Sequence, residues 1–237
     1  MGIKDIFKKP WEHSDSKKRM KAVDNLNNQN ILIDIAKNDE NGNVRFKAVG
    51  KINNQKILED IAKNDLNECV RAVAVRRIEN QSILVNLFKN TEIGENIRSL
   101  ALKRINVHSV IINIAKNSEN TNFTEIAMMK INDQNVLFDI ARKGKSESVR
   151  IQAVKKITNP LVIADIARND ESVAVRVKAV KKVENQDILI DIAKNDKSDA
   201  VRAKAVKKIT NPIVLLDLAK RRRVTMFLPK FKKKINV

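Results

Sequence analysis

Apolar residues recur along this chain at the spacing of helices, and they do not alternate at the period of two that strands require. One short stretch carries Ile31, Leu32, Ile35 and Ala36, and the next carries Val44, Ala48, Val49 and Ile52. Each set forms a stripe on one side of a short helix. Because helices of this length are unstable alone in water, each stripe must be covered by a neighbouring helix.

The two stripes return together at a fixed interval. A Val-Arg pair, or its substitute, marks the second stripe at Val44, Val70, Ile97, Phe123, Val149, Val175 and Val201, in steps of 26 residues with a single step of 27. An Asp or Asn beside the residues of the first stripe recurs at the same spacing from Asp34 to Asp217. The extra residue falls within 86–97 in both series. Such regularity predicts a stacked repeat in which each unit covers the apolar face of the next.

Side chains that can cap a helix precede both stripes. Seven of the eight positions before the first stripe are Asn or Asp, namely Asn28, Asn54, Asn80, Asp133, Asn159, Asn185 and Asn211. Pro160 and Pro212 follow two of them, at the first helical position. Before the second stripe stand Asp15, Asn41, Asn67, Gly94, Asn120, Ser146, Ser172 and Ser198. Each repeat is therefore predicted to be a first helix of about ten residues, a loop and a second helix of about twelve.

The repeated pattern DIAxNDxxxxVRxxAVxKI resembles the short HEAT-like repeats of the kind also found in phycobilisome lyases. The opening FKKPWEHSDSKKRMKAV is similar to the start of bacterial and archaeal HEAT-like proteins. The resemblance covers residues 7–220. It implies a solenoid whose second helices line the concave surface, and it is specific for fold rather than for function.

We therefore predict an all-α fold, a right-handed α-solenoid of short two-helix HEAT-like repeats with a period of 26 residues. The solenoid spans residues 15–220 and holds seven full helix pairs with a half-repeat at each end. Residues 1–14 form an N-terminal cap, in which Trp11 helps to cover the first helix, and residues 221–237 form a basic tail or cap. A variant leucine-rich solenoid with a tighter first helix is the structural alternative.

The repeated arginine has a structural explanation. On a helical wheel Arg176 falls inside the apolar arc, where a guanidinium needs a partner. Asp170 precedes it by six residues, and the same spacing separates Asp39 from Arg45, Asp65 from Arg71 and Asp196 from Arg202. We expect each arginine to pair with the aspartate of its own repeat. Gly144 stands before Arg150, so that arginine is expected to use Asp170 of the next repeat.

A second series of basic residues comes six positions after the arginine. Its members are Lys51, Arg77, Arg104, Lys130, Lys156, Lys182 and Lys208, and Arg76, Lys103, Lys155, Lys181 and Lys207 stand beside them. By the resemblance they form a basic stripe on the concave face, which predicts binding of an acidic partner. The alternative is that cations in the last helical turn oppose the negative end of the helix dipole, for about 0.3–1 kcal/mol each. That role also fits the first-helix lysines such as Lys37.

Two further segments are candidates for contact with a partner. The last 17 residues carry seven basic and no acidic side chains, so Arg221, Arg222 and Arg223 belong either to an interaction arm or to a solubilising tail. The central repeats deviate most from the pattern, and Phe123, Met128 and Met129 are either drift or a partner-specific patch.

Composition narrows the functional classes. The formal net charge is +19, aromatic residues are 3% of the chain, and there is one Cys and no Tyr. No catalytic, cofactor-binding or metal-ligating pattern is present, and no apolar run is long enough to span a membrane. We expect a cytoplasmic, monomeric, non-enzymatic scaffold without cofactors that binds an acidic protein or another anionic macromolecule.

Two alternatives remain open. Binding of a nucleic-acid backbone suits the positive charge, although stacking platforms for bases would need more aromatic residues. A bilin-lyase activity follows from the resemblance alone.

Overall fold

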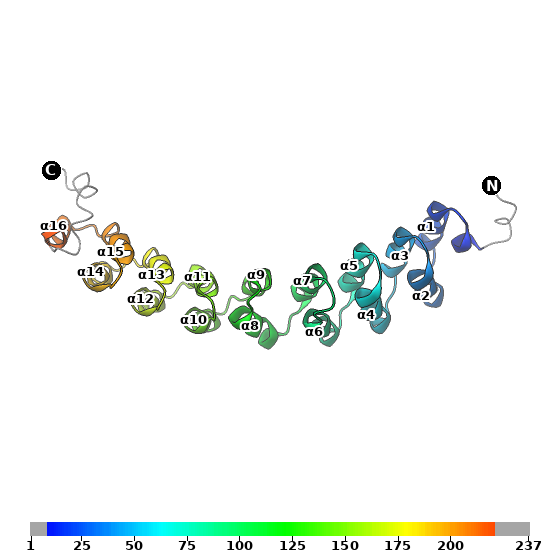
Figure 1. The fold of residues 1–237 in the computed structure, drawn as a ribbon, viewed down its shortest axis with the longest axis horizontal. Coiled ribbons are helices and arrows are strands. Elements are labelled where there is room, and N and C mark those ends of the chain that lie inside the picture. The colour runs from blue at the N-terminus through cyan, green and yellow to red at the C-terminus, as the bar shows by residue number, and fades with distance from the viewer. Residues whose placement is uncertain (1–8, 221–237) are drawn as a thin grey trace. The chain divides into compact units, whose positions relative to one another are not determined.

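The chain is described by a computed structural model over residues 9–220, in which sixteen α-helices follow one short 3-10 helix, η2 (Pro10–Glu12), without any strand (Figure 1). The even-numbered helices, here called first helices, are α2 (Gln29–Asn38), α4 (Gln55–Asn64), α6 (Gln81–Lys89), α8 (His108–Asn117), α10 (Gln134–Lys143), α12 (Pro160–Asn169), α14 (Gln186–Asn195) and α16 (Pro212–Lys220). The odd-numbered helices, here called second helices, are α1 (Ser16–Asp24), α3 (Gly42–Val49), α5 (Glu68–Arg77), α7 (Glu95–Arg104), α9 (Thr121–Met129), α11 (Glu147–Lys156), α13 (Val173–Val180) and α15 (Asp199–Val206). The predicted all-α class is confirmed for this range.

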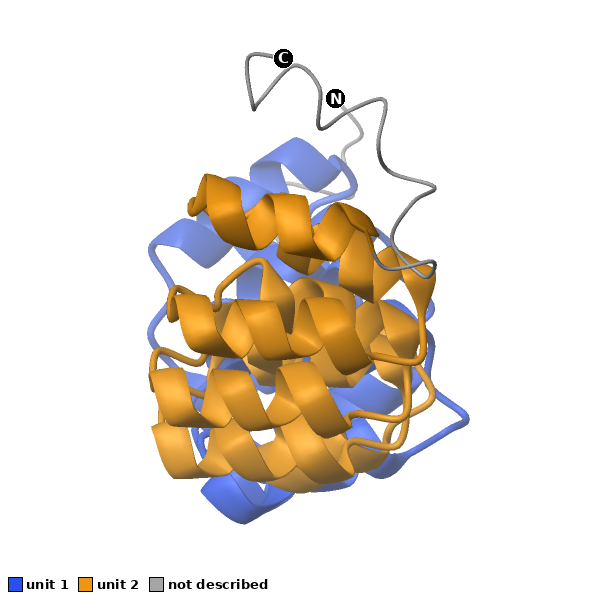
Figure 2. Cartoon of the chain, turned by 90° about the vertical axis from the view of Figure 1, so that its left-hand side faces the viewer, with its two compact units in different colours: residues 1–110 blue, residues 111–237 orange. Residues whose placement is uncertain are grey.

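Consecutive helices pack in a repeating order. Within each unit, first helices lie against second helices, as in α4 with α5 or α12 with α13, and second helices contact each other, as in α3 with α5 or α11 with α13. The chain divides into two compact units, residues 1–110 and residues 111–237, with the division inside α8 (Figure 2). The sequence did not predict this division.

Helix ends follow the predicted caps. The Asn54 side chain accepts from the N–H groups of Lys56 and Ile57, and Ser172 does the same for α13. The first helices are α-helices of nine or ten residues, not the tighter helices of the alternative fold. The second helices have eight to ten residues, fewer than expected, because the chain tightens into turns after them. Lys51 N–H, for example, donates to the Ala48 carbonyl just beyond α3.

The core is made of the two aliphatic stripes. Leu32, Ala36, Val44 and Ala48 have no exposed surface, and the equivalent positions of other repeats are buried as well. At about 25 cal/mol per Å² of apolar surface removed from water, this burial stabilises helices that are too short to persist alone. At the N-terminal end of the described range, η2 lies against α1.

The repeated arginines are buried, but their partner is not the aspartate of their own repeat. Arg176 is only 1% exposed, and its Nε and Nη2 atoms donate to the two carboxylate oxygens of Asp196 at 2.8 and 3.0 Å. Asp196 lies in the next repeat. Asp170, the expected partner, offers only its backbone carbonyl, which accepts from Nη1 at 2.8 Å. The predicted pairing within a repeat is therefore wrong, since the ion pair joins successive repeats.

The same contact recurs along the described chain. It joins Arg19 to Asp39, Arg45 to Asp65 and Arg150 to Asp170. The pair between Arg150 and Asp170 confirms the expectation for the repeat that has Gly144 in place of an aspartate. Pairing with the aspartate of the next repeat was expected for Arg150 alone, and it also occurs in the other ion pairs of this series.

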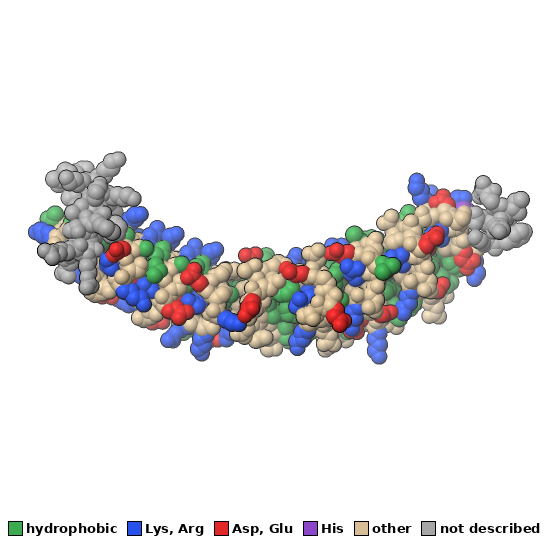
Figure 3. Space-filling model, viewed as in Figure 1, with side chains coloured by type: hydrophobic (Ala, Val, Ile, Leu, Met, Phe, Trp, Pro, Cys, Tyr) green, Lys and Arg blue, Asp and Glu red, His purple; other side chains and the backbone are tan. Residues whose placement is uncertain are grey.

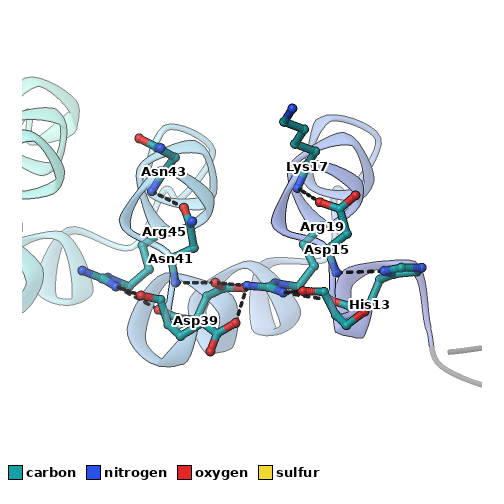
Figure 4. A network of polar contacts seen from close by, with 10 residues as sticks. His13, Asp15, Lys17, Arg19, Asp39, Asn41, Asn43 and Arg45 are labelled. Atoms are coloured by element: carbon teal, nitrogen blue, oxygen red, sulfur yellow. Dashed lines mark hydrogen bonds and ion pairs between the residues drawn. The ribbon is translucent and has the colours of Figure 1, made fainter. Parts of the chain in front are cut away.

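Each aspartate in this series has two roles. Figure 4 shows the Asp39 carboxylate between the guanidinium of Arg19 and the backbone N–H of Asn41, which donates to it at 2.8 Å. The hydrogen bond to Asp39 raises the pKa of Arg19 above its ordinary value. The carboxylate therefore shapes the loop of its own repeat and holds the preceding repeat against it.

Three consecutive positions of this series have no carboxylate. The residues twenty positions after Arg71, Arg98 and Thr124 are Thr91, Ser118 and Gly144. Arg71 still donates to the Asp65 carbonyl at 2.6 Å, so its contact within the repeat remains. Within residues 9–220, the arginine–aspartate pairs at this separation therefore lie on either side of these three positions.

Replacing Asp196 with Asn should lower the free energy of unfolding by about 3 kcal/mol, because it leaves the Arg176 guanidinium buried without a counter-charge. The matched control is Asp187→Asn on the exposed surface of α14, which should change stability by less than about 0.5 kcal/mol. Urea unfolding followed by circular dichroism measures both. Equal midpoints for the two variants would contradict the assigned role of the pair.

Candidate basic interaction surface

The predicted basic series lies at the ends of the second helices, and most of its charged groups contact the preceding repeat. The Lys182 ammonium donates to the carbonyl oxygens of Val154 and Lys155 at 3.1 and 2.9 Å, and also to that of Ile157. These carbonyls belong to the last turn of α11 and the residue after it, where no helical N–H is available to them. Lys182 therefore caps the preceding second helix.

Other members of the series make the same kind of contact. Lys51 donates to the carbonyls of Val23 and Asp24, Arg77 to that of Ile52, Arg104 to that of Ile78, Lys156 to those of Met128 and Ile131, and Lys208 to those of Lys181 and Val183. Burial lowers the pKa of Lys130, of Lys156 and of Lys182. The series has a role inside the fold, and its role in partner binding stays a prediction.

The lysines beside this series point elsewhere. Lys155, Lys181 and Lys207 are exposed, and Lys178 and Lys204 lie one turn before the last two of them. We call these five residues the cationic face; they belong to α11, α13 and α15 or directly follow them. Figure 3 shows Lys and Arg side chains gathered over this part of unit 2. Within residues 9–220, Lys178, Lys181 and Lys204 form no ion pair.

The pKa shifts show how closely these cations lie. Burial is the largest cause that lowers the pKa of Lys204. The ammonium groups of Lys181, Lys207 and Lys208 lower it further. A positive charge that lies close to others is stabilised when an anion approaches.

The position that Lys178 occupies differs in the repeats of unit 1. Lys47 occupies the position of Lys178, but the Asp24 carboxylate of the preceding helix pairs with its ammonium at 2.7 Å. Val73 and Leu100 occupy the same position in the next two repeats and carry no charge. In unit 2, Lys178 and Lys204 occupy this position without a carboxylate partner among the described residues.

Three basic residues of the first helices pair with an aspartate of the next repeat. Lys37 contacts Asp60 at 3.1 Å, Lys116 contacts Asp139, and Arg168 contacts Asp191 at 2.8 Å. The hydrogen bond from the cation is the largest cause that lowers the pKa of each of these aspartates. This pairing bridges first helices and leaves the first-helix surface nearly neutral.

Sequence reasoning missed a third contact between repeats, made by glutamine. Gln29 donates to the Lys51 carbonyl at 3.1 Å through Nε2 and accepts from the Asn53 N–H at 3.1 Å through Oε1. Related bridges are made by Gln55, Gln81, Gln134 and Gln186. The signal was present, since a Gln follows the Asn or Asp cap in each of these first helices.

The remaining sequence candidates separate into core and surface. Phe123 and Met128 are 4% and 3% exposed, so two of the three residues in the suggested central patch belong to the core. Met129 is 78% exposed. Arg221, Arg222 and Arg223 lie outside the described residues.

Comparisons with known proteins add no relative. No protein-family model, no curated protein and no solved structure matches the chain. Between residues 9 and 220, no helix combines the length and the apolar character needed to cross a membrane. The same part of the chain holds no group of three or more His, Cys, Asp or Glu side chains placed to bind a metal ion.

Adjacent lysines with different roles give a matched test. Lys182→Met should lower the free energy of unfolding by about 1 kcal/mol or more, because carbonyl groups of α11 lose their donor while the apolar stem is kept. Lys181→Met removes the same charge from an exposed position and should change stability by less than about 0.5 kcal/mol. Thermal unfolding at low protein concentration compares the two. A Lys181 variant that is destabilised as much as the Lys182 variant would contradict the division of roles.

Proposed function

We propose that this protein is a non-enzymatic interaction scaffold whose cationic face binds an acidic protein. The observation that supports the proposal most directly is the set of unpaired lysines Lys178, Lys181 and Lys204 on adjacent second helices of unit 2. Like charges held together without counter-ions destabilise one another, and a carboxylate-rich surface relieves that repulsion. The short spacing between packed helices, about 8–10 Å, places each pair of lysines within reach of one acidic segment.

In this proposal the basic series predicted from the sequence contributes charge but no direct contact with the partner. Lys156, Lys182 and Lys208 lie next to the cationic face but donate to backbone carbonyls. They add positive potential behind the exposed lysines without offering a free ammonium group. The partner contact is therefore assigned to the neighbouring lysines.

Binding of a nucleic-acid backbone is the second candidate, because phosphates would neutralise the same lysines. The helices α11, α13 and α15 contain no aromatic residue, so the face offers no platform on which bases would stack. This absence favours an acidic protein over a single-stranded nucleic acid.

Charge reversal tests the proposal. The variant with Lys178→Glu, Lys181→Glu and Lys204→Glu should recover the acidic partner from native lysate at least about tenfold less well than the unmodified chain. The control variant, with Lys17→Glu, Lys56→Glu and Lys197→Glu, has the same net charge but changes exposed residues elsewhere, so its recovery should be unchanged. Quantitative mass spectrometry of the captured proteins measures the difference.

Two results would contradict the proposal. Equal losses in both variants would mean that net charge, not the cationic face, governs binding. Tight, salt-dependent binding of duplex DNA or RNA that is lost only in the first variant would favour the nucleic-acid candidate.

We also propose that the helical array is a right-handed solenoid of HEAT-like repeats with a 26-residue period. The proposal is supported by helix starts such as Gln29, Gln55 and Gln81, and by ion pairs that recur at one sequence separation. A crystal structure of the full chain should show repeats that advance as a right-handed superhelix. A left-handed superhelix in that crystal structure would contradict the assignment.

A further inference from the structure

Two of the seven complete repeats lack the bridging glutamine, since α8 begins at His108 and α12 at Pro160. In α12 the first residue is Pro160, at the position that Gln29, Gln55, Gln81, Gln134 and Gln186 occupy in their own helices. By the spacing of those bridges, the backbone groups that a glutamine would contact here are the Lys182 carbonyl and the Glu184 N–H. Neither group has a hydrogen-bond partner among the described residues.

A hollow takes the place of the missing side chain. It has a volume of about 370 Å³ and is lined by Pro160, Leu161, Ile163, Lys182, Glu184 and Ile188, among others. Leu161 is 78% exposed at its edge, so the hollow combines an apolar wall with the two backbone groups. Beside α12 the chain thus leaves open a site that its own glutamines fill in five other repeats.

We propose that this hollow binds the side-chain carboxamide of a glutamine from a partner polypeptide. A primary carboxamide has one acceptor and two donors, which suit an N–H and a carbonyl held two residues apart. Gln186 shows that arrangement in the next repeat, where its Oε1 accepts from the Thr210 N–H and its Nε2 donates to the Lys208 carbonyl. The methylene groups of a bound glutamine would lie against Leu161 and Ile188.

The chemistry of the site selects against a carboxylate. A glutamate side chain accepts from the Glu184 N–H but has no donor for the Lys182 carbonyl, and it would place a negative charge beside that oxygen. An aliphatic side chain of equal length leaves both backbone groups without a partner. This site is separate from the cationic face, so the proposal does not rest on the proposed function.

Nuclear magnetic resonance of the full, nitrogen-15-labelled chain tests the proposal with N-acetylglutamine N-methylamide as the probe. Saturable shifts are expected at the Glu184 amide, with a dissociation constant of about 10 mM or above for so small a ligand. The matching glutamate and norvaline derivatives should bind at least about fivefold more weakly. Equal binding of the three probes, or no saturable shift, would overturn the proposal.

The variant Pro160→Gln supplies the missing side chain in the context of Asn159, which is already the helix cap. It should abolish the probe-induced shifts and slow hydrogen exchange of the Glu184 amide by about tenfold, to the level of the bridged Thr158 and Thr210 amides. Shifts that persist in this variant would overturn the proposal. A Glu184 amide that is already as protected as Thr158 in the unmodified chain would do so as well.

The triple charge reversal at Lys178, Lys181 and Lys204 separates the two proposals. It should leave the probe-induced shifts at Glu184 unchanged while acidic-partner recovery falls. If this variant lost the probe-induced shifts as well as partner recovery, the hollow would depend on the cationic face. That result would contradict the proposal that the two sites are independent.

Discussion

A hydrogen-bonded ion pair between an arginine of one repeat and an aspartate of the next fixes how successive repeats meet at four junctions of the described chain. A second helix of eight to ten residues contributes a narrow apolar stripe, and a guanidinium placed within that stripe is costly unless its charge is balanced. The aspartate balances it with two oxygens and uses one of them to order its own loop. The same carboxylate therefore orders the loop within its repeat and joins that repeat to the preceding one.

Much of the fold could be predicted from the sequence because it depends on local rules. Helical periodicity, Asn caps such as Asn54 and the burial of Val175 and Ala179 follow from the chain alone. The partner of Arg176 could not be derived in the same way. A helical wheel gives the direction of a side chain but not the element that lies opposite it. Arg176 pairs with Asp196 of the next repeat, and Asp170, six residues before it in the chain, offers only a backbone carbonyl.

The candidate site was predicted less completely because it also depends on contacts between repeats. Lys181 and Lys182 are neighbours in the sequence with the same charge, yet one faces water and the other donates to carbonyls of the preceding repeat. Their side chains leave the chain in different directions, and the structure shows that only that of Lys182 reaches these carbonyls. The glutamine bridges were also missed, although Gln55 and Gln81 each follow a helix cap directly. A polar residue at the start of a helix is expected to be exposed to water, so the glutamines did not indicate a contact.

The direction of the arginine contact also governs how the array can change in length. At each paired junction one repeat supplies the arginine and the next supplies the aspartate, so the paired junctions are chemically equivalent. Excision of residues 151–176 would leave Arg150 twenty positions before Asp196, which is the separation found in every existing pair. Removal of such a segment therefore keeps the sequence separation on which the contact depends. The geometry of the contact sets no fixed number of repeats.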